Sequence, residues 1–248
     1  MKRIFLEDVT AEKITISGDD ARHLAYSLRA RRGDRLTAVD RAGRRAIIEL
    51  TDFDKNAINA QRVGEIQLVA VSKKIILADC LPKQNRFDTI IEKATELGID
   101  QIQPLISERT IARPNNFREK SKLERWTRIA KEAAEQCARD TVPEIENIRD
   151  LDEWLKEIMP LDEKNFFLLF CWEKEQDTTV REVLSAYKNS KADKNLIVLI
   201  GPEGGFSERE VREIKFAGGI SVTLGKRVLK TDTAAISALA MINYEFME

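Results

Sequence analysis

The segment Asn195-Leu-Ile-Val-Leu-Ile-Gly-Pro-Glu-Gly-Gly-Phe206 decides how this chain folds. Residues 196–200 are all apolar and predict a buried strand. The strand runs into a turn in which glycines permit a tight backbone path, and Ser207 with Glu210 has the capping-box spacing that opens a helix. Open α/β sheets bind ligands at such strand–turn–helix connections. Glu203, inside the turn, is either a solvated side chain of a sharp connection or a functional group.

A second segment repeats this order about twenty residues later, in Val222-Thr-Leu-Gly-Lys-Arg-Val-Leu-Lys-Thr-Asp-Thr-Ala-Ala235. A short strand at 220–224 ends at a glycine, and three basic residues precede an alanine-rich helix. Asp232 or Thr231 is expected to serve as the N-cap and to accept the unpaired amide hydrogens of the first turn.

Together the two segments resemble the cofactor loops of the SPOUT superfamily of RNA methyltransferases. More closely they resemble the RsmE family, which methylates N3 of a uridine in small-subunit ribosomal RNA. The family pattern Gly-Pro-Glu-Gly-Gly-Phe is complete here, whereas the pattern Leu-Gly-x-Arg-Ile-Leu-Arg-x-Glu-Thr-Ala is met with Val228, Lys230 and Asp232 as departures. Segments 93–98, 104–109, 125–126 and 132–139 are also similar to the family, so the resemblance covers nearly the whole chain.

Composition excludes several classes of protein. The 248 residues are 43% hydrophobic and 33% charged, as in ordinary globular proteins, and no apolar run approaches the length of a membrane span. The N-terminus lacks an apolar signal segment, so we expect a cytoplasmic protein with no membrane partner. Three widely spaced cysteines and a single histidine, His23, make no metal-ligand pattern, and we expect no metal.

Charge is unevenly distributed although the net charge is only −1. Residues 22–45 contain eight arginines and two acids. A local basic patch of this kind is what phosphate binding requires, and the alternative is a solvated arginine-rich face.

Residues 1–70 are rich in strand patterns, at 13–16, 35–39 and 45–50, with turn signals at 33–34 and 42–43 and one helix near 19–29. Several short strands with glycine turns favour a small barrel. The resemblance implies a PUA-like RNA-binding barrel in this region.

From residue 74 the pattern alternates between strand and helix. Strands are expected at 75–81, 101–106, 166–171, 196–200 and 221–224, and helices at 86–97, 119–139, 151–158, 178–188, 208–217 and 233–246. Alternation of this kind predicts an α/β fold with a parallel sheet covered by helices on both faces. Periodicity alone favours an open doubly wound sheet, whereas the resemblance implies a SPOUT domain over 74–248 with a C-terminal trefoil knot. The join between the domains is expected at 68–73.

The resemblance implies S-adenosylmethionine (SAM) as the methyl donor. Backbone groups can approach a cofactor closely where no side chain intervenes, which suits Gly201, Gly204 and Gly225. Four apolar residues at the loop edges could flank the adenine or could simply belong to the core: Leu199, Ile200, Leu224 and Leu229. By resemblance Thr233 and Ala234, at the start of the last helix, complete the cofactor site.

Methylation of uridine N3 requires loss of its imide proton, and hence a base or a cation that stabilises the developing oxyanion. Glu203 and Asp232 are the candidate bases, although Asp232 could act only as a helix cap. Arg109, Arg139 or Arg227 could supply the positive charge.

RNA contacts are expected from the arginine cluster and from polar residues of the second domain. The expected contacts are Arg29, Arg31, Arg32, Lys83, Arg86, Gln136 and Arg227. The partners implied are 16S ribosomal RNA in the small subunit and a second copy of the chain. The last helix carries an apolar stripe suited to a homodimer or to burial within one chain: Ile236, Leu239, Ala240, Asn243 and Tyr244.

Two alternatives stay open at this point. One is a SPOUT enzyme that modifies a ribose 2′-hydroxyl or another base, and the other is a ribosome-assembly protein that binds RNA without turnover. A phosphate-loop nucleotidase is disfavoured, because the chain has no Gly-x-x-x-x-Gly-Lys-Ser/Thr motif.

Overall fold

The computed structural model describes residues 2–40, 43–54, 57–68, 73–111, 113, 116–159, 165–189 and 194–246. Part of the expected join at 68–73, Ala42 of one expected turn and Arg41 of the arginine cluster lie outside these residues. The chain divides into two compact units, Met1–Val71 with Ala134–Val142, and Ser72–Ala133 with Pro143–Glu248. Residues 134–139, the end of the helix expected at 119–139, thus belong to the N-terminal unit, which no sequence pattern indicated.

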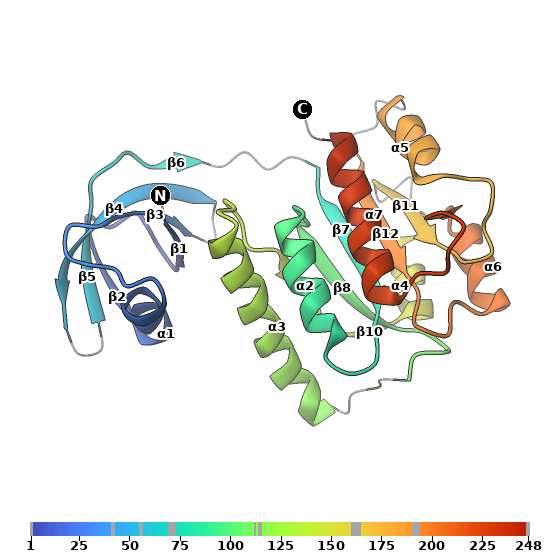
Figure 1. The fold of residues 1–248 in the computed structure, drawn as a ribbon, viewed down its shortest axis with the longest axis horizontal. Coiled ribbons are helices and arrows are strands. Elements are labelled where there is room, and N and C mark those ends of the chain that lie inside the picture. The colour runs from blue at the N-terminus through green and yellow to red at the C-terminus, as the bar shows by residue number, and fades with distance from the viewer. Residues whose placement is uncertain are drawn as a thin grey trace. The chain divides into compact units, whose positions relative to one another are not determined.

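The N-terminal unit is a curled six-stranded sheet in the order β1-β3-β4-β5-β2, with β6 paired to β4 (Figure 1). Its strands are β1 (Arg3–Leu6), β2 (Lys13–Ser17), β3 (Arg35–Asp40), β4 (Arg44–Phe53), β5 (Ala57–Arg62) and β6 (Gln67–Leu68). The β1–β3 pair is parallel and the other pairs are antiparallel. In β2, Ile14 and Ile16 are buried while Lys13, Thr15 and Ser17 are exposed, so the alternation places one face on the core.

The single helix expected at 19–29 is shorter and irregular. It consists of α1 (Gly18–Arg22) followed by a π-helical turn η1 (His23–Ser27). Arg29 has a φ of 48°, in the left-handed region, which stops helical continuation at this point.

The C-terminal unit is built on a seven-stranded sheet in which every pair is parallel, as the sequence predicts. The order is β10-β8-β7-β12-β11-β13, with β9 on β8. The strands are β7 (Ile75–Cys80), β8 (Gln101–Ile106), β9 (Glu144–Ile145), β10 (Arg149–Asp150), β11 (Phe166–Cys171), β12 (Asn195–Ile200) and β13 (Ile220–Val222). The two-residue strands β9 and β10 had no sequence signal.

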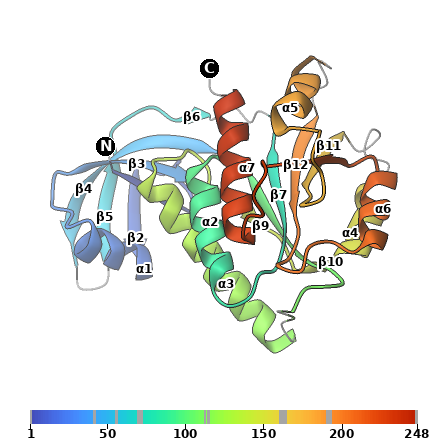
Figure 2. The same ribbon diagram turned by 45° about the vertical axis from the view of Figure 1, so that its right-hand side comes forward.

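Helices cover both faces of this sheet (Figures 1 and 2). They are α2 (Arg86–Glu96), α3 (Asn116–Gln136), α4 (Leu151–Ile158), α5 (Val180–Asn189), α6 (Glu208–Phe216) and α7 (Thr231–Phe246). Apolar residues of α4 and α6 share one core cluster with alternate residues of β7, β11 and β12, while α7 packs against α2, α5 and β12. The Phe87 and Trp126 rings meet edge to face at 4.6 Å and join α3 to α2.

Candidate functional site

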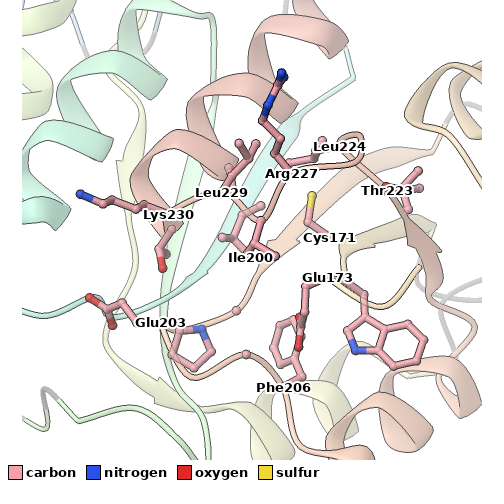
Figure 3. A pocket seen from close by; sticks show the side chains of 18 of the residues that line it. Cys171, Glu173, Ile200, Glu203, Phe206, Thr223, Leu224, Arg227, Leu229 and Lys230 are labelled. Carbon is pink, nitrogen blue, oxygen red and sulfur yellow. The ribbon is translucent and has the colours of Figure 1, made fainter. Parts of the chain in front are cut away.

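A cavity of about 430 Å³ lies at the carboxyl ends of β11, β12 and β13, within the C-terminal unit (Figure 3). Three chain segments line it, 171–173, 200–206 and 222–231, together with Ala234. Its volume is typical of small-molecule sites, and its position is where open α/β sheets bind ligands. Both glycine-containing sequence segments therefore border one cavity.

The turn after β12 is tight, with the Gly205 amide donating to the Pro202 carbonyl at 2.9 Å and a Gly205 φ of 65°. A β-carbon on Gly201 would lie 3.0 Å from the Phe206 ring, and one on Gly204 would lie 3.2 Å from Cβ of Arg109. The missing side chains at these two positions thus accommodate neighbouring protein groups. A bulky residue at Gly201 would displace Phe206 before it met any ligand.

Hydrogen bonds from the side chains of Arg109, Ser207 and Glu210 hold this turn in place. Arg109 Nη1 donates to the carbonyl oxygens of Gly204 at 2.9 Å and of Phe206 at 3.4 Å. The capping box of Ser207 and Glu210 is present, as predicted, and Glu210 also accepts the Glu108 amide at 2.7 Å. Glu210 is only 1% exposed, so its carboxylate ties the loop after β8 to the start of α6. Sequence reasoning found the cap and missed this second bond.

Acidic side chains gather at the end of β7, beside the glycine turn. Glu203 Oε1 accepts the Lys83 amide at 2.8 Å. Asp79 pairs in register with Ile200, is fully buried, and neither carboxylate oxygen has a hydrogen-bond partner among the described residues. Burial, followed by the charges of Glu203 and Asp232, raises the pKa of Asp79 well above its ordinary value. The environment of Asp79 thus favours the protonated form of its carboxyl, and its only sequence signal was an acid inside an apolar strand.

The second loop begins at Gly225, which has a φ of 113° and no described atom within 4 Å of its would-be β-carbon. Figure 3 shows Arg227 and Lys230 extending away from the cavity centre, while Leu229 and Ile200 lie between Arg227 and the glycine turn. Helix α7 begins at Thr231, two residues earlier than expected. The prediction that Thr231 or Asp232 is the N-cap is therefore wrong, since both residues lie inside the helix. The Oδ1 atom of Asp232 is buried and has no hydrogen-bond partner among the described residues.

The structure brings together most of the residues that the sequence assigned to a cofactor. The cavity is lined by Ile200, Gly201, Gly204, Leu224, Gly225, Leu229 and Ala234, and by Glu203 and Arg227. Leu199 is instead fully buried in the core cluster, because alternate residues of β12 face opposite sides of the sheet. Thr233 is exposed and lies outside the lining.

Two further candidates, Gln136 and Arg139, belong to the N-terminal unit. Arg139 Nη2 lies 3.3 Å from the Thr141 hydroxyl, and the Gln136 side chain is exposed. Lys83 and Arg86 follow β7 in the C-terminal unit, with Lys83 exposed and Arg86 half-buried.

The arginine cluster separates into paired and unpaired members. Arg35 pairs with Glu49 at 2.9 Å, Arg44 pairs with Asp8 and Asp40, and Arg45 pairs with Asp140. By contrast Arg29, Arg31 and Arg32 are exposed, and none of the three has an ion-pair partner within the described part of the chain. These three are the members of the cluster that the sequence analysis expects to contact RNA.

The apolar stripe expected on the last helix is split by the fold. Leu239 is buried within the chain, together with Ala235, Ala238 and Ile242. Tyr244 and Met241 remain exposed, at 73% and 41%.

Within the described ranges, no helix is long and apolar enough to cross a membrane. The same ranges hold no group of three or more His, Cys, Asp or Glu side chains that could bind a metal ion.

Comparison with known proteins gives consistent matches. A family model for the RNA methyltransferase domain matches residues 70–243. The ribosomal RNA small subunit methyltransferase E of Bacillus subtilis is 30% identical to this chain, and the alignment covers 99% of this chain and 97% of that protein. A crystal structure of ribosomal RNA small subunit methyltransferase E from Neisseria gonorrhoeae bound to S-adenosyl methionine superimposes with a TM-score of 0.84 at 28% identity, over the full length of both chains. A methyltransferase from Legionella pneumophila in complex with SAM gives a TM-score of 0.80 at 26% identity, over 98% of this chain and 97% of its own.

Proposed function

The chain belongs to the RNA methyltransferase family named ribosomal RNA small subunit methyltransferase E, and on this premise we propose that it transfers the methyl group of SAM to N3 of a uridine in 16S ribosomal RNA. The observation that carries the proposal is the single cavity bordered by both segments that resemble the family's cofactor loops. Bound SAM supplies a methyl group that its sulfonium already activates. The protein's own task is then to position the reactants and to remove one proton.

The cavity fits a ligand of this chemistry. Ile200, Leu224 and Leu229 offer apolar surface for adenine, and Gly225 leaves its backbone open on the side where a β-carbon would stand. Arg109 and Glu210 support the site indirectly, because their hydrogen bonds fix the turn whose backbone faces the cavity.

We propose that Glu203, which lines the cavity, acts as the base that removes the N3 proton of the uridine. Arg227, which also lines the cavity, would stabilise the negative charge that develops on the uracil oxygens. Asp232 is the less suitable base, since one of its oxygens is buried. Glu203→Gln is a clean test because the amide oxygen can still accept the Lys83 N–H, so the variant loses basicity and keeps the contact. Turnover with SAM and RNA saturating should fall markedly in Glu203→Gln and stay near wild type in Asp232→Asn; the reverse ranking would transfer the role to Asp232.

The N-terminal sheet supports a role as a PUA-like RNA-binding barrel. Its unpaired arginines Arg29, Arg31 and Arg32 are free to contact phosphates, whereas the paired ones are engaged within the protein. Lys83, Arg86, Gln136 and Arg139 are proposed as additional RNA contacts.

For assembly we propose a cytoplasmic homodimer of SPOUT domains, each with a C-terminal trefoil knot. Exposed Tyr244 and Met241 on α7 support a contact between copies, which replaces the wider stripe expected from the sequence. Sedimentation that gives only monomer at micromolar concentration, with full activity, would reject the dimer.

Methyl transfer from tritiated SAM tests the function directly. Free 16S RNA and assembled small subunits are offered in parallel, and the labelled RNA is digested to nucleosides. Label in N3-methyluridine supports the proposal. Label in a 2′-O-methyl nucleoside or another base favours the other SPOUT activities, and SAM binding without transfer favours an RNA-binding assembly protein.

A further inference from the structure

Glu173 is a carboxylate that lines the cavity and that the proposed reaction does not use. It follows β11, the strand next to β12 in the sheet, so it stands beside the glycine turn although 28 to 32 residues separate them in sequence. Figure 3 shows its side chain directed toward Phe206 and the turn, away from Arg227 and Lys230. The two sides of the cavity thus carry opposite charges.

The backbone that carries Glu173 is tied at both ends. The Trp172 amide donates to the Val222 carbonyl at 3.2 Å, and the Glu175 amide donates to the Trp172 carbonyl at 3.1 Å. Lys215 also lies over the Trp172 ring, 5.1 Å from its centroid. Glu173 is therefore presented from a fixed turn.

The Glu173 carboxylate lies directly on the glycine turn. A β-carbon on Gly205 would be 2.7 Å from Oε1 and 3.2 Å from Oε2 of Glu173, so this carboxylate fills the space that a side chain at 205 would need. No hydrogen bond or ion pair to another described residue holds it. The nearby Glu175 differs, because its oxygens accept from the Ser221 hydroxyl and from the amides of Asp177 and Thr178. Glu175 is structural, while Glu173 offers two free acceptors to the cavity.

We propose that Glu173 binds the ribose hydroxyls of the S-adenosyl ligand, an inference that rests on the proposed use of SAM. A carboxylate can accept one hydrogen bond from each hydroxyl of a vicinal diol. The placement follows a general logic of α/β nucleotide sites, in which a glycine turn ends one strand and an acid after the neighbouring strand receives the ribose. Here the glycine turn follows β12 and the acid follows β11.

Calorimetric binding of S-adenosylhomocysteine and of its 2′,3′-dideoxy analogue to the full chain tests the assignment. Glu173→Gln should weaken binding of the parent ligand, and Glu173→Ala should weaken it further, by roughly 10- to 100-fold, the range for a hydrogen bond to a charged group. Wild type and variants should bind the dideoxy analogue equally, because this ligand lacks the hydroxyls with which Glu173 would interact. Asp177→Asn, which removes an exposed acid outside the lining, is the matched control and should bind both ligands like wild type.

Equal affinity of Glu173→Ala and wild type for S-adenosylhomocysteine would overturn the inference and leave the proposed function intact. An analogue of S-adenosylhomocysteine without the α-amino group gives a second test. If Glu173→Ala binds this analogue as tightly as wild type does, but binds the dideoxy analogue more weakly than wild type does, the carboxylate pairs with the ammonium group. The ribose assignment would then be wrong. Wild type that binds none of these ligands would instead remove the proposed use of SAM. Urea unfolding midpoints show whether the variants are folded. Because the Glu173 side chain is exposed and has no partner among the described residues, its replacement should leave the midpoint unchanged.

Discussion

Replacement of Asp79 by asparagine should change how the stability of the C-terminal unit depends on pH. Asp79 is fully buried between β8 and β12, and its pKa is raised well above the ordinary value by burial and by the charges of Glu203 and Asp232. An aspartate in the unfolded chain ionises near pH 3.9. Between that pH and the folded pKa, the folded state holds one proton that the unfolded state has lost.

The sign and size follow from this difference in bound protons. Because the folded state binds more protons, the free energy of unfolding falls as pH rises, by about 1.4 kcal/mol per pH unit for one proton. Below about pH 3.9 both states are protonated and the carboxyl makes no pH-dependent contribution. An asparagine side chain cannot ionise, so the stability of Asp79→Asn relative to wild type should rise by about 1.4 kcal/mol per pH unit from about pH 4.5 upward, and level off at the folded pKa.

Urea unfolding followed by tryptophan fluorescence, at half-unit steps from about pH 4.5 to 8, measures this difference. All three tryptophans lie in the C-terminal unit, so the signal reports on the part that contains Asp79. Asp177→Asn removes an exposed acid and should track wild type at every pH. A difference between Asp79→Asn and wild type that stays constant from about pH 5 to 7 would refute the reasoning, since Asp79 would then be ionised in the fold.

Two further variants test the support of the glycine turn, and a third tests the arginines of the N-terminal unit. Glu210→Gln leaves only one side-chain oxygen to accept from two backbone amides, so the free energy of unfolding in urea should fall by about 1.5–3 kcal/mol. Glu208 is exposed, and the control variant Glu208→Gln should change the free energy of unfolding little. Arg109→Lys keeps the charge and loses the planar fork, so S-adenosylhomocysteine affinity should fall roughly 10-fold by calorimetry; unchanged affinity would mean that the capping box alone holds the turn. Joint alanine replacement of Arg29, Arg31 and Arg32 should weaken RNA binding and reduce the slope of log affinity against log salt by about 2 to 3, whereas alanine at Arg35, which is paired to Glu49, should leave the slope almost unchanged.

Elements whose signals are local could be predicted from the sequence. The apolar run of β12, the glycine turn and the Ser207–Glu210 cap depend on residues within a few positions of one another, and all three are present. Alternation of strands and helices likewise predicted a parallel sheet covered on both faces, because parallel strands require long crossovers. The start of α7 was misplaced, because the Lys230–Thr231–Asp232 run offers several positions at which a helix can begin.

Contacts between residues that are distant in sequence could not be predicted in this way. The space left by Gly201 and Gly204 is filled by Phe206 and Arg109, and the free carboxylate at Gly205 comes from Glu173 on a neighbouring strand. Asp79 is buried and has a raised pKa because β7 lies between β8 and β12, with its end beside Glu203. These relations depend on the order of strands in the sheet. Periodicity records which face of an element is apolar, but it carries no information about which element becomes its neighbour.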